Sequence, residues 1–254
     1  MIHIIYSHSS YFDILKVQHD YFQKNKNKND IIILFINHTN NIFPNNFDKI
    51  IYYNETLNYS KRILHCIKEC NITDKFIIFH LDINILVKKN DEYIEKLINM
   101  CNKFNIDRLD FNCYKYKDDQ LNLKIDDNYI LIKNDNINDF IYNVGTAIYN
   151  LNSFKKLLEN FDYSYRIFET TKEVQIYCKN NMNCYYLNNI NGININCGYY
   201  HMTNILLFIH ITHDGKLLPK NNNENKLELF LQEIYDNITE NYTFNKKYRD
   251  FMHK

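Results

Sequence analysis

A chain of 254 residues is long enough for one sizeable α/β domain, and its 45% hydrophobic residues, including 22 Tyr and 17 Phe, are enough to fill a core. This composition excludes a chain dominated by disorder. The 30 basic and 30 acidic residues balance to a formal net charge of zero, so the basic surface that nucleic-acid binding requires is not expected.

The cysteines and the first residues indicate the compartment. Seven cysteines without a CxxC pair argue against both a disulfide framework and a zinc ribbon, so buried free thiols in a reducing compartment are the better interpretation. No stretch approaches the roughly 20 apolar residues of a membrane helix. The first ten residues lack the basic and apolar regions of a secretory signal. We therefore expect a soluble protein of the cytoplasm, or of the host cytoplasm if the source is a virus, and not a secreted one.

The first half of the chain alternates buried strands with amphipathic helices. Runs of β-branched and aromatic residues predict the strands, and apolar positions at helical spacing predict the helices. The predicted strands are 2–6, 30–36, 49–53, 76–80 and 107–114, and the predicted helices are 11–24, 57–70 and 91–104. This order is typical of a wound, mainly parallel central sheet flanked by helices.

The second half is more mixed. We expect a hairpin of strands 120–125 and 129–133, a strand over 140–149, helices over 153–160, 169–180 and 226–238, short strands over 184–187 and 206–212, and a turn over 213–216. No repeat or linker divides the chain, which predicts one domain over 1–254. Its parts would be a first half over 1–118, a smaller mixed region over 119–218 and a helical extension over 219–254.

The segment Lys75–Val87 joins a buried strand to an acidic turn, Leu81-Asp82-Ile83-Asn84. Open α/β sheets bind ligands at the carboxyl ends of their strands, so Asp82 is a candidate ligand-binding residue. Asp82 and Asn84 could face one hard cation together, and Mg²⁺ or Mn²⁺ could bridge them to a diphosphate. A surface Asp that ends a strand is the alternative, because Asp is common in turns.

Three glycine-containing motifs are absent. The chain has no GxGxxG after the first strand, no GxxxxGK[ST] and no GxSxG. With four glycines in all, a nucleotide would be held by side chains, cations or a metal rather than by a glycine loop.

The order of several short motifs resembles that of GT-A fold glycosyltransferases, especially small sugar transferases of bacterial glycan clusters and large DNA viruses. Tyr59-Ser60-Lys61-Arg62 starts a helix, the next strand ends at Asp82, and a later strand begins Asp107-Arg108-Leu109. Asn143–Tyr149 (NVGTAIY), Phe168-Glu169 and His210–Lys216 (HITHDGK) then match the family's later strand, its glutamate segment and its closing turn. The similarity covers about residues 1–218.

The resemblance implies a nucleotide-sugar-dependent enzyme. Residues 1–118 would bind a nucleotide diphospho-sugar, and residues 119–218 would meet a glycan or glycoconjugate acceptor. The reaction would be hexosyl or deoxyhexosyl transfer to a hydroxyl group, with inversion. The acidic turn has one carboxylate where the family often has two, so Arg62 or Lys216 could neutralise the diphosphate in place of a metal. This departure also leaves open a catalytically inactive GT-A-like module that binds a nucleotide or glycan.

The candidate site residues fall into three groups, and the oligomeric state stays open. Those for the nucleotide-sugar are Tyr6, Ser7, Tyr53, Ser60, Arg62, Asp82 and Lys216. Those for Mn²⁺ or Mg²⁺ are Asp82, Asn84 and His210. The candidate general base is Glu169, with Glu173 one helical turn on as its rival.

Structural roles compete with these assignments. Glu169 could stabilise a helix N-terminus, and His210 could be a hydrogen-bonded core residue. Arg62 could form a helix-surface pair, for example with Glu69, and the tyrosines could serve only in packing.

Overall fold

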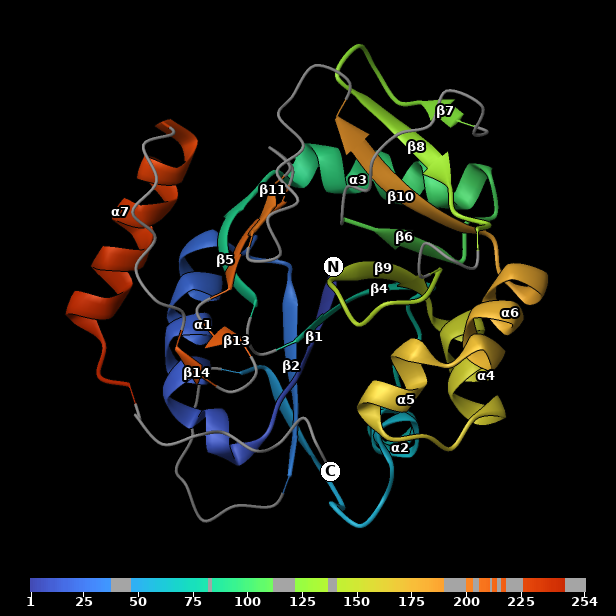
Figure 1. The fold of residues 1–254 in the computed structure, drawn as a ribbon, viewed down its shortest axis with the longest axis horizontal. Coiled ribbons are helices and arrows are strands. Elements are labelled where there is room, and N and C mark those ends of the chain that lie inside the picture. Colours follow the sequence, from blue (N-terminus) through green and yellow to red (C-terminus); the bar gives the residue numbers. More distant parts are fainter. Residues whose placement is uncertain are drawn as a thin grey trace.

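The protein is described by a computed structural model, in which a nine-stranded sheet carries helices on both faces (Figure 1). The structure describes residues 1–37, 47–81, 84–111, 122–136, 141–189, 200–202, 206–210, 212–213, 216–217 and 226–244. At residues 189, 200–202, 206–210, 212–213, 216–217, 226–232 and 235 it describes the backbone alone.

The strands of the large sheet lie in the order β3-β2-β1-β4-β9-β6-β10-β8-β7. The first four, all parallel, are β1 (Ile2–Tyr6), β2 (Ile31–Asn37), β3 (Lys49–Tyr53) and β4 (Phe76–Leu81). The others are β6 (Arg108–Asp110), β7 (Asn122–Lys124), β8 (Tyr129–Lys133), β9 (Ala147–Asn150) and β10 (Cys184–Asn189).

One antiparallel strand, β9, lies between β4 and β6. Because β9 is antiparallel to both neighbours, β6 runs in the direction of β4, and β10 is parallel to β6. The strands β1, β2, β3, β4, β6 and β10 therefore end at one edge of the sheet, and β9 begins there. We call this edge the carboxyl edge.

Helices cover both faces of the sheet (Figure 1). They are α1 (Phe12–Asn25), preceded by the 3-10 turn η1 (Ser9–Tyr11), α2 (Tyr59–Cys70), α3 (Asp91–Lys103), α4 (Leu151–Asn160), α5 (Tyr165–Thr170), α6 (Lys172–Asn181) and α7 (Lys226–Asn241). Apolar side chains of α3 pack on one face, those of α2, α4, α5 and α6 pack on the other, and α1 contributes side chains to both core clusters.

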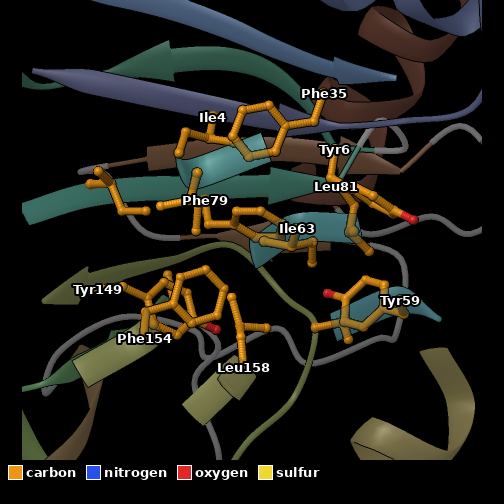
Figure 2. Packing of buried hydrophobic residues seen from close by; sticks show 14 of the residues in the cluster. Ile4, Tyr6, Phe35, Tyr59, Ile63, Phe79, Leu81, Tyr149, Phe154 and Leu158 are labelled. Atoms are coloured by element: carbon orange, nitrogen blue, oxygen red, sulfur yellow. The ribbon is translucent and has the colours of Figure 1, made fainter. Parts of the chain in front are cut away.

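Alternation along β1 divides the core between these two faces. Ile4 and Tyr6 belong to the cluster that packs against α2 and α4, and Ile5 belongs to the cluster on the opposite face. Figure 2 shows the first cluster, in which Ile63 of α2 and Phe154 of α4 lie beneath the side chains of the strands. A strand that is buried on both faces needs an apolar residue at nearly every position, which explains its continuous apolar run.

Two smaller sheets flank the large one. The first has the order β11-β12-β5, and the second pairs β13 with β14. Their strands are β5 (Asn84–Lys89), β11 (Tyr200–Met202), β12 (Leu206–His210), β13 (Thr212–His213) and β14 (Lys216–Leu217).

The expected α/β class, a wound sheet flanked by helices, is confirmed. The predicted helix over 169–180 is wrong in one respect, because α5 and α6 are separate helices. Thr171 between them is extended, with φ −70° and ψ 134°, and the Thr170 hydroxyl donates to the carbonyl of Arg166. Side chains of this kind compete with the backbone for hydrogen bonds and so favour a helix end.

The predicted strand over 140–149 is also shorter than expected, since β9 begins at Ala147. Residues 141–146 precede it without strand pairing, and residue 140 lies outside the described residues. Side chains take up the backbone N–H groups there: Gln175 accepts from Tyr142, Glu169 accepts from Val144, and Asn143 accepts from Gly145. These donors are satisfied without a neighbouring strand.

Candidate functional site

Tyr6, Ser7 and Tyr53 lie in the core at the carboxyl edge. The rings of Tyr6 and Tyr53 stack with centroids 5.3 Å apart, and the Tyr53 hydroxyl donates to the carbonyl of Ser7 over 2.7 Å. All three residues are buried, and burial raises the pKa of Tyr6 to about 12. These contacts brace the ends of β1 and β3. Nucleoside contact by the three side chains stays a prediction.

Ser60 and Arg62, in the first turn of α2, contact backbone carbonyls. The Ser60 hydroxyl donates to the carbonyl of Phe161 over 2.9 Å. The guanidinium of Arg62 donates to the carbonyls of Glu55 and Leu57, and the side chain is buried. This arrangement braces the loop that follows β3, and a phosphate contact by Arg62 stays a prediction.

His8 and Glu55 form a partly exposed polar pair at the same edge, and the sequence interpretation missed it. Nε2 of His8 lies 2.6 Å from Oε1 of Glu55, and Nδ1 accepts the N–H of Ser10 over 3.1 Å. The proton of the ring therefore sits on Nε2 and is donated to Glu55. This hydrogen bond lowers the pKa of Glu55, which favours the carboxylate. The polar run after the first strand was the available signal.

Asp82 and Ile83 lie outside the described residues, but the residues on either side of them are firmly held. Gln18 of α1 donates from Nε2 to the carbonyls of Leu81 and Asn84, over 3.0 and 3.1 Å. The side-chain amide of Asn84 donates to the hydroxyl of Thr146 over 2.8 Å. Both ends of the Asp82 segment are thus fixed to neighbouring elements.

Asn84 also has a free ligand atom. Its Oδ1 is buried and has no hydrogen-bond partner within the described part of the chain. The Cα atoms of Asn84 and His210 are directly paired in the antiparallel ladder of β5 and β12. Lys216 of β14 pairs with His213 of β13. The structure describes only the backbone of His210 and Lys216.

A divalent cation at Asp82, Asn84 and His210 stays a prediction. Carboxylate and amide oxygens with an imidazole nitrogen suit Mn²⁺, and the oxygens suit Mg²⁺. The unpartnered Oδ1 of Asn84 is the observation that favours a ligand here. Among the side chains that the structure describes, no three His, Cys, Asp or Glu groups gather into a metal site.

Glu169, in α5, lies against the segment that precedes β9. Its Oε1 accepts the backbone N–H of Val144 over 3.2 Å. Burial raises the pKa of Glu169, while the Val144 N–H and the charge of Arg166 act in the opposite direction. A carboxylate with a raised pKa is a better general base near neutral pH.

Glu173 has different surroundings. It is exposed on α6 and accepts a hydrogen bond from the hydroxyl of Tyr163. Of the two glutamates, Glu169 is the one that contacts the Val144–Thr146 segment among the described contacts.

A buried ionic cluster at the end of β6 was not foreseen. Arg108 donates to the carboxylate of Asp110 over 2.9 Å and to the carbonyl of Ile141 over 2.9 Å, and Asn143 donates to the same carboxylate. Arg108 and Asp110 are fully buried. The alternating charges in the sequence Arg108-Leu109-Asp110 were the available signal. The cluster fixes the shape of the 141–146 segment against β6.

A hollow of about 670 Å³ lies elsewhere, between α1 and α7, and is lined by polar groups such as Asp20, Lys24 and Tyr242. None of the candidate site residues lines it. In the part of the chain that the structure describes, no helix has the length and apolar character needed to cross a membrane.

No protein-family model and no curated protein sequence matches the chain. Solved structures that are similar include S. aureus TarS 1–349 in complex with UDP-GlcNAc, with 11% identity over 73% of this chain and 57% of that one and a TM-score of 0.45. The 4-diphosphocytidyl-2C-methyl-D-erythritol synthase of Anaerococcus prevotii is 15% identical over 73% and 86%, with a TM-score of 0.40. The glycosyltransferase GlyE of Streptococcus pneumoniae is 8% identical over 69% and 42%, with a TM-score of 0.37.

The chain spans less than two thirds of the length of the TarS structures that it matches. At these identities the likeness is one of fold, and the ligands in those structures are known for those proteins alone. The wound α/β class of this chain rests on its own sheet order.

Proposed function

We propose that this protein is a GT-A-like glycosyltransferase that moves a hexosyl or deoxyhexosyl group from a nucleotide diphospho-sugar to a hydroxyl of a glycan or glycoconjugate. One observation carries the proposal. Glu169 and Asn84 come from opposite halves of the chain and contact the two ends of one short segment, Val144–Thr146. Asn84 is two residues from Asp82 in the sequence, so a candidate base and a candidate diphosphate site share one support.

Glu169 acts as the general base. Its carboxylate takes the proton of the acceptor hydroxyl while the hydroxyl oxygen attacks the anomeric carbon, and the nucleoside diphosphate leaves. Attack on the face opposite the leaving group inverts the anomeric configuration. The raised pKa of Glu169 supports this role.

Asp82 lies at the donor diphosphate. Asp82, Asn84 and His210 would hold a Mn²⁺ or Mg²⁺ ion, and the ion would compensate the negative charge of the leaving diphosphate. The cations Arg62 and Lys216 are further candidates for phosphate contact. The strand ends at Tyr6, Ser7 and Tyr53, together with Ser60, form the nucleoside side of the site, where His8 and Glu55 are accessible polar groups.

A nucleotide panel tests the proposal. UDP and GDP, each with and without Mn²⁺, are added to the wild-type protein and to Asp82→Ala, and the melting temperature is measured. A ligand that binds the native state raises this temperature. We expect a rise for the wild type with at least one nucleotide and a smaller rise for Asp82→Ala. Equal responses of the two proteins, or none from either, would overturn the proposal.

The alternative is a catalytically inactive GT-A-like module that binds a nucleotide or glycan. The single carboxylate in the turn Leu81–Asn84 favours it. This alternative predicts binding without turnover, so release of free nucleoside diphosphate from any nucleotide-sugar by the wild type, absent from Glu169→Gln, excludes it.

A further inference from the structure

Gln18 of α1 makes an unusual contact with the candidate site. Its side chain is fully buried, and one nitrogen, Nε2, donates to two backbone carbonyls, those of Leu81 and Asn84. These carbonyls flank Asp82 and Ile83. A single amide therefore ties together both ends of the two-residue segment that contains Asp82.

Packing alone does not account for an amide at this position. Oε1 of Gln18 is buried without a hydrogen-bond partner in the described part of the chain. Leaving such an atom unsatisfied is unfavourable, so an apolar side chain of similar size would suit a role in packing better. What Gln18 adds, and an apolar residue cannot, is the pair of hydrogen bonds to the two carbonyls.

A second support reaches Asn84 through a series of buried polar side chains that contact one another. Asn84 donates to Thr146 over 2.8 Å, and Thr146 Oγ1 lies 3.5 Å from Nδ1 of His80. Nε2 of His80 lies 3.0 Å from Nδ1 of His3. Nε2 of His3 faces the carboxylate of Asp30 at 3.7 Å.

The hydrogen bonds in this series of side chains run in one direction, from Asn84 towards Asp30. The Asn84 amide can only donate to the Thr146 oxygen, so the hydroxyl proton is available for Nδ1 of His80. His80 then donates from Nε2 to His3, and the remaining N–H of His3 faces Asp30. The reverse arrangement would place a nitrogen lone pair against the Asp30 carboxylate. Burial lowers the pKa of both histidines, which keeps each ring neutral with a single proton.

We propose that Gln18 is a positioning residue for the backbone at Leu81 and Asn84, on either side of Asp82, and that the side chains of His3, His80, Thr146 and Asn84 form a second support for the same backbone. Gln18 holds the carbonyls of Leu81 and Asn84, which flank the candidate donor residue Asp82 in the sequence, at a fixed separation. The part that concerns the donor rests on the proposed function, whereas the restraint on the turn does not.

Hydrogen exchange followed by mass spectrometry tests the restraint in the free protein. Gln18→Met removes both donors and keeps the length of the side chain. Gln23→Met, on the same helix, is the matched control, because Gln23 lies further along α1 and its amide contacts His19. We expect peptides that span residues 80–86 to exchange about 5- to 30-fold faster in Gln18→Met, as loss of two hydrogen bonds predicts. Peptides of β2 report any global loss of stability.

Equal exchange over residues 80–86 in Gln18→Met and wild type, or an increase of the same size in β2, would overturn the proposal. Thr146→Val tests the second support by the same measurement without altering α1. Thr146→Ser keeps the hydroxyl and should restore slow exchange.

Titration with UDP or GDP and Mn²⁺ provides the functional readout. We expect Gln18→Met to weaken nucleotide binding about 10-fold at a temperature where the variant stays folded, with Gln23→Met unchanged. If the wild type binds neither nucleotide, the proposed function fails, while the exchange result still decides the role of Gln18. If the wild type binds and Gln18→Met binds equally well, the positioning role fails alone.

Discussion

The side chain of Asn84 donates a 2.8 Å hydrogen bond to the hydroxyl of Thr146, which lies 62 residues further along the chain. Two residues before Thr146, the backbone N–H of Val144 donates to Glu169. The start of β5 and α5 are therefore both attached to the loop that precedes β9. This relationship brings Glu169, the candidate base, and Asn84, a candidate metal ligand, to one short segment.

The pH dependence of the reaction follows from the surroundings of Glu169. Burial raises the pKa of this carboxyl, and the base must be ionised to accept a proton. We expect kcat/KM to rise with pH along an acid limb whose midpoint lies above the usual range for glutamate. Initial rates of nucleoside diphosphate release between pH 4 and 8 measure it. An acid limb whose midpoint lies at the pKa of a free glutamate would contradict the assignment of Glu169 as the general base.

Replacing Arg108 by leucine should destabilise the fold strongly. Arg108→Leu leaves the buried carboxylate of Asp110 without its cation, and loss of one partner of a buried ion pair costs about 3–5 kcal/mol. Urea unfolding measures the change. Arg166→Leu, on the exposed side of α5, is the control and should stay within about 0.5 kcal/mol of wild type. Similar losses in the two variants would show that Asp110 does not need Arg108.

The buried histidines make stability depend on pH. Burial is the main cause that lowers the pKa of His3 and His80; the charges of Lys89 and the N-terminal amine add to it for His3, and those of His3 and Lys89 add to it for His80. The unfolded rings take up protons near pH 6.5, while the folded rings stay neutral. The contribution of the two histidines to the free energy of unfolding is thus fully present above about pH 6.5. It falls as the pH drops below this value, by about 1.4 kcal/mol per pH unit for each proton that the unfolded state takes up.

His80→Asn should reduce that slope. Urea unfolding at pH 7 and pH 5.5 gives the two free energies for each protein. The control is His65→Asn, because His65 is exposed on α2 and its loss should leave the slope unchanged. If His80→Asn keeps the wild-type slope, then His80 does not stay neutral in the folded state.

The first half of the fold could be predicted because its signals are local. Each of β1 to β4 is a continuous apolar run, and α1 to α3 carry apolar residues at helical spacing, so the wound order followed. The place of β9 between β4 and β6 depends on pairing between residues that are far apart in the sequence, such as Ile78 with Ile148. No local pattern records such a pairing.

The site was predicted in part. Glu169 was chosen from its place before a helix, and the structure instead puts it within α5 with a contact to Val144. His8 with Glu55 was missed because the two residues follow different strands, β1 and β3. Arg108 with Asp110 was missed because a buried charge looks like a surface charge in the sequence. Asp82 lies outside the described residues, so its role rests on Gln18 and Asn84 beside it.

The rate of nucleoside diphosphate release, measured together with nucleotide affinity, shows whether Glu169 is the general base of a sugar transfer. The proteins are wild type, Glu169→Gln and the control Glu173→Gln, supplied with the nucleotide-sugar of whichever nucleotide binds. A general base contributes about 10²- to 10⁴-fold to the rate. We expect a loss of that size for Glu169→Gln, with nucleotide affinity unchanged and Glu173→Gln close to wild type. Equal turnover by wild type and Glu169→Gln would contradict it.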